Sequence, residues 1–402
     1  MPFSQPLSSS LSVAPGGSTA ERNSMQTEAQ TQSVCGIVLA GSHHWGDTAF
    51  ERMFRGPLLP VAQVPVICYP LGWLRDGGVS EARICANSMT VPVRQYLGTG
   101  DRLGLSLEYY EDHSPRGPAG CARDAADMSN AETFVVVEGS MIPTVDLNAL
   151  LEAHRNSGAS ATIVVEVDRR RRAIEGADLR LPGGIYVLNR DVINTVAKNG
   201  YQDIKEGLLE RLYKTGNAVM TYELSGVSPR VLDYPTYTSV NRWLTAKAVE
   251  NQTYLANYIR VGDALIHPTA EVDATARLVG PVIVGPHASV GEDAMVVGSS
   301  TIGRGSVVAA GALVSRSIVW SNCWVGAKAV VDDTLLADHC IVEPGHQMFG
   351  AVHIAPANRP VPQATTDVQV ETIESAAVGD RKFWSSLSLV ASMGFRRETA
   401  SV

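Results

Sequence analysis

A strict period of six residues in the C-terminal half of the chain restricts the fold more than any other feature. Every sixth residue from Ile266 to Trp320 is apolar, which gives ten matches in register, and the residue four positions after each is mostly small. The apolar positions are Ile266, Val272, Leu278, Val284, Val290, Val296, Ile302, Val308, Val314 and Trp320. This repeat predicts a parallel β-helix, because each hexad forms one face of a triangular coil and only stacked coils bury the aliphatic row.

The register of the repeat is predicted to slip after Trp320. The apolar positions then continue through Val325, Val331, Leu335 and Ile341, and the repeat is expected to end near Pro344-Gly345.

Upstream of the repeat, strand-like and helix-like segments alternate. Val34–Leu39 and Thr133–Val137 are short runs rich in β-branched residues, which predict buried parallel strands. Val66–Asp76 and Leu147–Asn156 carry apolar residues at helical spacing, and Gly77 after the first is a helix-stop signal. The alternation predicts an α/β domain with a doubly wound parallel sheet.

These zones divide the 402 residues into four predicted parts. They are a disordered tail (1–33), an α/β domain (34–248), a hexapeptide-repeat domain (249–350) and a second, mostly disordered tail (351–402). The second tail contains KFWSSLSLVASMGF, residues 382–395, whose apolar residues could form one short amphipathic helix. Such a helix would dock on the body of the protein or contact a partner, and the alternative is a weakly ordered tail.

Charge and composition exclude several classes of protein. The net charge of −8 argues against nucleic-acid binding, which needs a clustered basic surface. The one basic run, Arg169–Arg172, is interpreted as a solvated turn, with a phosphate clamp as the alternative. The N-terminus lacks the pattern of a secretory signal, and no apolar run reaches the length of about 18 residues that a membrane span needs.

The six cysteines are scattered and show no CxxC spacing. Four of them lie in apolar surroundings where buried free thiols are common. This pattern predicts a reducing compartment, a cytoplasmic location and no structural metal.

Five segments resemble, in this order, the sugar-1-phosphate nucleotidyltransferase family. They are GIVLAGSHHWGD (36–47), GPLLPVAQVPVICYPLGWLRDGGV (56–79), SPRGPAGCARDAAD (114–127), FVVVEGSMIPTVDLNALLEAHRNSGASATI (134–163) and GGIYVLNRDVI (183–193). Together with the repeat, the arrangement is closest to mannose-1-phosphate guanylyltransferase-like proteins. The resemblance implies a Rossmann-like nucleotidyltransferase domain followed by a left-handed parallel β-helix.

Enzymes of this family join a sugar 1-phosphate to the α-phosphate of a nucleoside triphosphate and release pyrophosphate. The chemistry needs a glycine-rich loop for the phosphates, cations, a lysine for the sugar phosphate and carboxylates for Mg²⁺. In the loop, Gly41 keeps the first glycine of the family. Ser42, Trp45 and Gly46 stand at the positions of the second glycine, the threonine and the arginine. Trp45 would obstruct a pyrophosphate, so the resemblance implies that the phosphate loop is lost.

The other reactive groups of the family are replaced as well. Gly56 stands at the position of the activating lysine, with Arg55 one position away. Ser140 replaces the first metal aspartate, and Arg230 stands at the second. The sugar-binding Glu-Lys-Pro strand of the family is missing between Asp168 and Gly183.

The losses fall on the reactive groups while packing segments such as LLPV and WLRDGGV persist, which favours an inactive scaffold. No catalytic or metal-binding residue is therefore assigned, and Mg²⁺ would be required only if the chain is active. Gly117–Gly120 is read either as part of a retained base-binding loop or as a loop that leads into a helix. The binding candidates are Gly41, Ser42, Gly117, Ala119, Gly120, Glu138, Gly139 and Gly184.

The favoured function is a catalytically impaired homologue that binds a sugar nucleotide or sugar phosphate. It would act as a regulatory or assembly subunit, in a homo-oligomer or together with an active relative. One alternative is an active nucleoside triphosphate:hexose-1-phosphate nucleotidyltransferase that uses Glu138 or Asp146 as a substitute metal ligand. The other is a hexapeptide-repeat acyltransferase, with His267, His287 or His339 as its general base.

Overall fold

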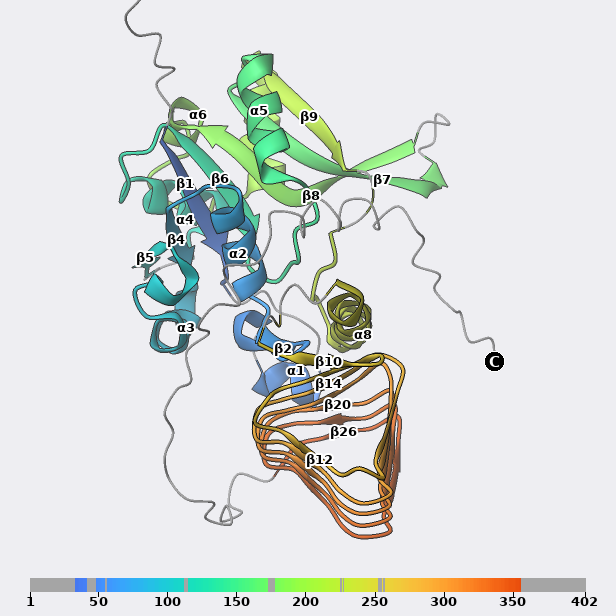
Figure 1. The fold of residues 1–402 in the computed structure, drawn as a ribbon. Coiled ribbons are helices and arrows are strands. Elements are labelled where there is room, and N and C mark those ends of the chain that lie inside the picture. Colours follow the sequence, from blue (N-terminus) through green and yellow to red (C-terminus); the bar gives the residue numbers. More distant parts are fainter. Residues whose placement is uncertain are drawn as a thin grey trace, which may run out of the picture. The chain divides into compact units, whose positions relative to one another are not determined.

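The computed structural model describes residues 33–41, 48–54, 56–111, 115–172, 178–224, 226, 228–251, 255 and 257–355 (Figure 1). The predictions for the N-terminal tail up to residue 32, for Ser42, Trp45 and Gly46, for Arg55 and for residues 382–395 lie outside the described residues.

A mixed seven-stranded sheet forms the centre of the α/β domain. Its order is β5–β4–β1–β6–β8–β7–β9. The strands are β1 (Val34–Leu39), β4 (Glu81–Cys85), β5 (Ser106–Tyr110), β6 (Thr133–Glu138), β7 (Ala161–Arg172), β8 (Asp178–Asn189) and β9 (Val219–Leu224). β1 pairs in parallel with β4 and β6, which confirms the two predicted buried strands.

Two expectations for this sheet need correction. β8 runs antiparallel to both β6 and β7, so the sheet is not wholly parallel. The reason is that β7 and β8 are connected directly, without the crossover helix that a parallel neighbour requires. The arginine run Arg169–Arg172, expected to be a turn, is the last third of β7.

Helices cover both faces of this sheet. α2 (Cys68–Asp76) and α5 (Leu147–Ser157) confirm the two helices expected from the sequence. They pack with Val38 of β1, whereas α4 (Gly117–Ala126) packs with Cys35 and Ile37 on the opposite face. Because successive residues of β1 point to opposite faces and both faces are covered, the strand is continuously apolar.

The remaining elements of this part are short apart from one long helix. They are α1 (Ala49–Met53), α3 (Thr90–Leu97), α6 (Arg190–Asn194), the π-helix η4 (Ile204–Leu209), α7 (Glu210–Lys214), α8 (Tyr234–Asn251), β2 (Pro60–Val61), β3 (Val64–Pro65) and the 3₁₀ turns η1 (Gly56–Leu58), η2 (Asn87–Met89) and η3 (Asp101–Leu103). Among the described helices, none is long and apolar enough to cross a membrane.

The predicted β-helix is formed by three sheets, one along each face of the stacked coils. They are named here by their first parallel strand: the β11 sheet (β10–β11–β14–β17–β20–β23–β26), the β12 sheet (β12–β15–β18–β21–β24) and the β13 sheet (β13–β16–β19–β22–β25). All pairs are parallel except β10 with β11. Figure 1 looks along the coil and shows its triangular section.

The strands of the β-helix are two or three residues long. They are β10 (Ile259–Val261), β11 (Ala264–Ile266), β12 (Glu271–Val272), β13 (Arg277–Val279), β14 (Val282–Val284), β15 (Ser289–Val290), β16 (Met295–Val297), β17 (Ser300–Ile302), β18 (Val307–Val308), β19 (Leu313–Ser315), β20 (Ile318–Val319), β21 (Trp324–Val325), β22 (Val330–Asp332), β23 (Leu335–Leu336), β24 (Ile341–Val342), β25 (Gln347–Phe349) and β26 (Val352–His353).

The slip in the repeat lies earlier than expected. Ile302 pairs with Val319 and Val314 pairs with Val331, so one residue is missing between Val314 and Val319. Trp320 therefore leaves the aliphatic row. Its indole N–H instead donates to the hydroxyl of Tyr237 on α8 at 2.9 Å.

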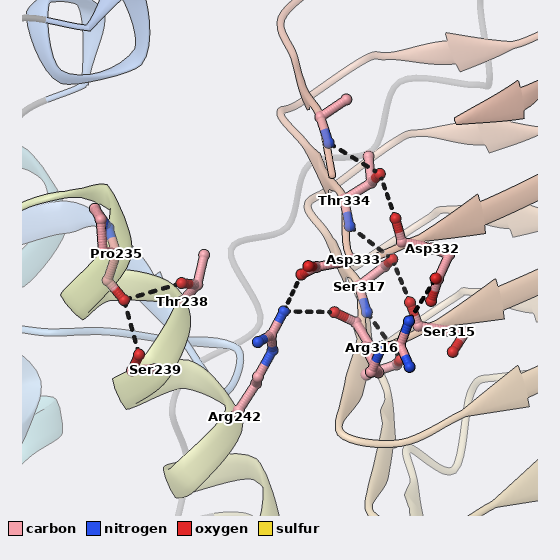
Figure 2. Close-up of polar contacts among 12 residues, drawn as sticks. Pro235, Thr238, Ser239, Arg242, Ser315, Arg316, Ser317, Asp332, Asp333 and Thr334 are labelled. Carbon is pink, nitrogen blue, oxygen red and sulfur yellow. Dashed lines mark hydrogen bonds and ion pairs between the residues drawn. The ribbon is translucent and has the colours of Figure 1, made fainter. Parts of the chain in front are cut away.

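One corner of the β-helix carries a ladder of hydroxyl groups (Figure 2). The backbone N–H of Ser317 donates to Ser300 Oγ at 3.1 Å, and the N–H of Thr334 donates to Ser317 Oγ at 3.0 Å. The N–H of Ala351 donates to Thr334 Oγ1 at 3.4 Å. Buried backbone groups at the corner are thus satisfied by side chains where the strands end.

The helix α8 joins the α/β elements to the β11 sheet. Tyr237 and Leu244 of α8 share one apolar cluster with Ile283, Ile318 and Leu335 of that sheet. At the corner shown in Figure 2, Arg242 donates to the carbonyl of Arg316 at 3.4 Å and forms an ion pair with Asp333. All six cysteines are buried.

Candidate functional site

The candidate residues of β1 and β6 lie side by side at the carboxyl edge of the sheet. Leu39 pairs with Glu138, the last residue of β6, and the N–H of Gly139 donates to the carbonyl of Leu39 at 2.8 Å. Gly41 follows two residues after β1. This edge is where open α/β sheets bind ligands.

Two of the candidate glycines are required by close packing. A Cβ atom on Gly139 would lie 2.9 Å from the Cβ of Ala40. Gly184 on β8 has φ +74°, and a Cβ there would lie 2.8 Å from the carboxyl carbon of Glu138. Glu138, Gly139 and Gly184 are therefore brought together, with the Glu138 carboxylate against the backbone of Gly184.

Gly41 is placed by a residue that sequence reasoning did not identify. A Cβ on Gly41 would lie 2.8 Å from Nδ2 of Asn87, which follows β4. Within the described part of the chain, the Oδ1 atom of Asn87 is buried and accepts no hydrogen bond. Its φ of 46° is in the left-handed region, which asparagine tolerates better than most residues. An asparagine directly after a predicted strand was therefore the available signal.

Ser140 and Arg230 lie next to each other. Met141 and Arg230 form an antiparallel bridge. The N–H of Val231 donates to the carbonyl of Ser140 at 2.8 Å. The two segments are far apart in sequence, and these backbone contacts bring them to the same edge of the sheet.

The guanidinium of Arg230 lies between two carboxylates. Its Nε is 3.5 Å from Glu138 Oε2, and its Nη2 is 3.1 Å from Glu166 Oε1. The three side chains are between 17% and 22% exposed, so the ion pairs are largely shielded from water. Glu166 Oε1 also accepts the N–H of Ser228 at 3.3 Å.

Glu166 is, after Asn87, a second residue of this site that sequence reasoning missed. It lies in the middle of β7, before the arginine run, and no motif marks it. Burial raises its pKa above the ordinary value, and the Arg230 cation opposes that rise. The sequence did carry one signal for such a residue, namely Arg230 at a position where the family has a metal ligand. A cation that is shielded from water needs carboxylate partners.

The described residues at this edge of the sheet do not fit a Mg²⁺ ion. Mg²⁺ prefers oxygen ligands in octahedral geometry, usually including carboxylates. Here the two family positions hold a hydroxyl and a cation, and the nearby carboxylates of Glu138 and Glu166 already pair with Arg230. Within the described ranges, no cluster of three His, Cys, Asp or Glu side chains could hold a metal ion.

Asp146 and Gly56 have clear local roles. Asp146 is the N-cap of α5, and its Oδ1 accepts the N–H groups of Asn148 at 2.9 Å and Ala149 at 3.1 Å. Its carboxylate is therefore engaged at the start of that helix. Gly56 begins η1, and a Cβ there would meet no atom within 4 Å.

The segment Gly117–Gly120 forms the first turn of α4. Gly117 has φ +71°, and a Cβ there would lie 2.5 Å from the carbonyl oxygen of Gln202. The same oxygen accepts the N–H of Ala119 at 3.0 Å. A Cβ on Gly120 would lie 2.9 Å from the Cβ of Arg116. The loop at Gln202 thus contacts the start of α4 and uses one of its first N–H groups.

The three histidines of the acyltransferase alternative lie at turns of the β-helix. His267 is half-buried, and its Nδ1 is 2.8 Å from Thr269 Oγ1. His287 and His339 have φ values of 55° and 63°, as do turn residues of other coils such as Asn322 at 57°. His287 and His339 therefore each occupy a turn between two strands of the β-helix.

Two families match this chain. Residues 51–174 match the family "Nucleotidyl transferase", and residues 260–358 match "GMPPB C-terminal domain". The two matches follow the two folded parts in order. In both folded parts the chain is similar to sugar-1-phosphate nucleotidyltransferases.

Several sugar-1-phosphate nucleotidyltransferases are similar to this chain. A UTP–glucose-1-phosphate uridylyltransferase from Synechocystis is 23% identical over 72% of this chain and 84% of its own length. A probable mannose-1-phosphate guanylyltransferase from rice is 26% identical over 71% of this chain and 81% of its own length. The mannose-1-phosphate guanylyltransferase of Mycobacterium tuberculosis is 22% identical over 46% of this chain, which spans 57% of that protein.

Proposed function

We propose that this chain is a catalytically impaired sugar-1-phosphate nucleotidyltransferase homologue that binds a sugar nucleotide or sugar phosphate. The observation that carries the proposal is the Arg230 guanidinium, 3.1 Å from Glu166 and 3.5 Å from Glu138, beside Ser140. A fixed cation at this place repels Mg²⁺ and neutralises the carboxylates that could otherwise bind it. Without the metal, the developing charge on the transferred phosphoryl group has no counter-ion there.

Ligand binding is supported by the position of the candidate residues at the carboxyl edge of the sheet. Gly139 and Gly184 let Ala40 and Glu138 pack closely at this edge, where open α/β sheets bind ligands, and Glu138 presents carboxylate oxygens that can accept hydrogen bonds from sugar hydroxyls. The proposed ligand is therefore a sugar nucleotide or sugar phosphate that is bound without turnover.

A regulatory or assembly role follows from the loss of turnover. The chain would act in a homo-oligomer or beside an active relative and report the level of a sugar nucleotide. A cytoplasmic location belongs to the same proposal and rests on the scattered cysteines. The base, the sugar and the partner are left open.

The decisive experiment measures pyrophosphate release from each nucleoside triphosphate with a panel of sugar 1-phosphates and Mg²⁺. The wild type is compared with the triple variant Gly56→Lys, Ser140→Asp, Arg230→Asp, which restores three family residues. We expect no turnover by the wild type, together with a rise in melting temperature when a sugar nucleotide is added. Turnover by the triple variant would identify the three replacements as the cause of inactivity.

Mg²⁺-dependent turnover by the wild type that is lost in Glu138→Gln would refute the proposal and favour substitute metal ligands. Present contacts weigh against that alternative, because Glu138 pairs with Arg230 and Asp146 caps α5. The acyltransferase alternative gains no support from the turn positions of His287 and His339.

A further inference from the structure

Two cysteines occupy the same corner of adjacent coils in the β-helix. Cys323 directly precedes β21 and Cys340 directly precedes β24, and these two strands pair Trp324 with Ile341. The N–H of Trp324 donates to the carbonyl of Cys340 at 2.8 Å, which holds the two positions side by side. Neighbouring strands lie about 4.8 Å apart. This spacing is within the range of about 4.4–6.8 Å between Cα atoms that a disulfide requires.

The two preceding coils show that this corner does not need a thiol for packing. Ala288 and Ser306 stand at the equivalent positions, directly before β15 and β18. Ser306 Oγ donates to the carbonyl of Trp320 at 2.6 Å and accepts the N–H of Cys323 at 3.0 Å. The corner therefore accepts a methyl group or a hydroxyl, and two consecutive thiols need another explanation.

The two thiols contact each other. The Cys323 thiol donates a hydrogen bond to the Cys340 sulfur, and this contact raises the pKa of Cys323 and lowers the pKa of Cys340. Cys323 Sγ also lies 3.0 Å from the carbonyl oxygen of Ala337. Cys340 is therefore the member of the pair that ionises more readily, and a thiolate is the form that attacks a disulfide.

Cys340 is covered by the last residues of the described chain. Both cysteines are at most 1% exposed. Among the described residues, the β12 sheet ends at β24, so no further strand of that sheet lies beyond this corner. The Cys340 thiol donates to the carbonyl of His353 at 3.1 Å, and the N–H of Ala355 donates to its sulfur. Because β26 is only two residues long, residues 353–355 can lift in a local opening that exposes the thiol.

We propose that Cys323 and Cys340 form a reversible disulfide that locks the last coil of the β-helix to the coil before it. The oxidant is a small disulfide such as oxidised glutathione, and in a reducing compartment the pair stays a dithiol. This inference is independent of the proposed function, because it concerns the end of the β-helix and not the edge of the α/β sheet.

The reaction is a thiol–disulfide exchange with a small disulfide R–S–S–R. The Cys340 thiolate attacks one sulfur, the S–S bond breaks, and the leaving R–S⁻ takes up the proton that Cys340 released. Cys323 then attacks the Cys340 sulfur of the mixed disulfide, which forms the new S–S bond and releases the second thiol with the proton of Cys323. The two cysteines lose two electrons and two protons in total, and the small disulfide is reduced to two thiols.

Incubation of the folded full chain with oxidised glutathione tests the proposal. Cys68 is the internal control, because at 8% exposed it is more accessible than either member of the pair, while burial raises its pKa to about 12. Cys323→Ser and Cys340→Ser are the matched variants, since Ser306 already places a hydroxyl in this corner. Mass spectrometry of peptides under non-reducing conditions locates each bond, and circular dichroism checks that each chain is folded.

We expect the peptides that carry Cys323 and Cys340 to become linked, with the loss of two hydrogens, before Cys68 carries a glutathione adduct. The link should raise the melting temperature of the wild type by about 5 °C, and dithiothreitol should reverse the rise. Neither serine variant should form the link or gain in melting temperature. An adduct on Cys68 while the pair stays unlinked would refute the proposal. A link that leaves the melting temperature unchanged would show that the last coil is not locked.

Discussion

At the scale of single residues, Arg230 determines what the site can do. Its position follows from the alignment with the family, but its partners do not: Glu138 lies at the end of β6 and Glu166 in the middle of β7. Both ion pairs are largely shielded from water. Removing Arg230 would therefore leave the charges of Glu138 and Glu166 without a compensating cation.

Replacing Arg230 with alanine should lower the free energy of unfolding by about 1–3 kcal/mol near pH 7, because Glu138 and Glu166 would face each other without a cation. Urea unfolding measures the change. Arg180→Ala is the matched control, since the Arg180–Glu223 pair is more than half exposed and should contribute less than about 1 kcal/mol.

The deficit of Arg230→Ala should depend on pH. The pKa of Glu166 is already raised by burial, and loss of Arg230 raises it further. A carboxyl group with a raised folded-state pKa favours the folded state below its unfolded pKa, and this contribution is lost as the pH rises through the folded value. The deficit should therefore be small near about pH 4 and grow towards neutral pH. A deficit that does not change with pH would contradict this coupling.

His154 on α5 should give the opposite pH dependence. It is 3% exposed, and its ring nitrogens lie 2.8 Å from Thr162 Oγ1 and 3.0 Å from Asn189 Oδ1. Burial lowers its pKa, so the unfolded chain takes up the proton first. Stability present above the unfolded pKa of about 6.5 is lost as the pH falls towards the folded value.

Thermal unfolding between about pH 7.5 and 5 measures this loss. The slope should become flatter in His154→Gln and stay unchanged in His346→Gln, where the side chain is exposed. An identical slope in all three chains would show that other groups cause the pH dependence.

At the scale of elements, the β-helix depends on its corners as well as on its aliphatic rows. The hydroxyls of Ser300, Ser317 and Thr334 each accept a backbone N–H from the next coil. The strands are only two or three residues long, so the corners must satisfy many backbone groups themselves.

The substitution Ser317→Ala should destabilise the chain by about 1–3 kcal/mol, because it leaves the buried N–H of Thr334 without an acceptor. Chemical denaturation detects the change. Ser289→Ala, on the outward side of β15, serves as the control and should stay within about 0.5 kcal/mol of the wild type. If both variants match the wild type, water replaces the lost hydroxyl and the ladder is not needed.

At the scale of the whole described chain, an aromatic cluster connects the α/β elements with the β-helix. The rings of Phe54 and Trp320 meet at 4.8 Å between centroids. The hydroxyl of Tyr237 donates to the carbonyl of Pro60 at 2.7 Å and accepts the indole N–H of Trp320. The missing residue in the repeat moves Trp320 out of the aliphatic row. Its side chain is thereby free to enter this cluster.

The Tyr237→Phe variant should therefore weaken both parts together. Trp320 would keep a buried N–H without an acceptor, at a cost of about 1–3 kcal/mol. Calorimetry should show one transition at a lower temperature, while Tyr213→Phe, where the side chain is 59% exposed, should melt like the wild type. Two separate transitions, of which only one moves, would indicate that the two parts unfold independently.

The sequence by itself determined the elements and their class. The period of six predicted the β-helix because its interior accepts one aliphatic residue per face, and the runs at Val34–Leu39 and Thr133–Val137 predicted buried parallel strands because both sheet faces are covered. The tertiary structure alone decided the partners of Arg230, the antiparallel direction of β8 and the exact place of the slip. Local patterns report how a side chain is buried, whereas charge pairing and coil register depend on residues far apart in sequence that only folding brings together.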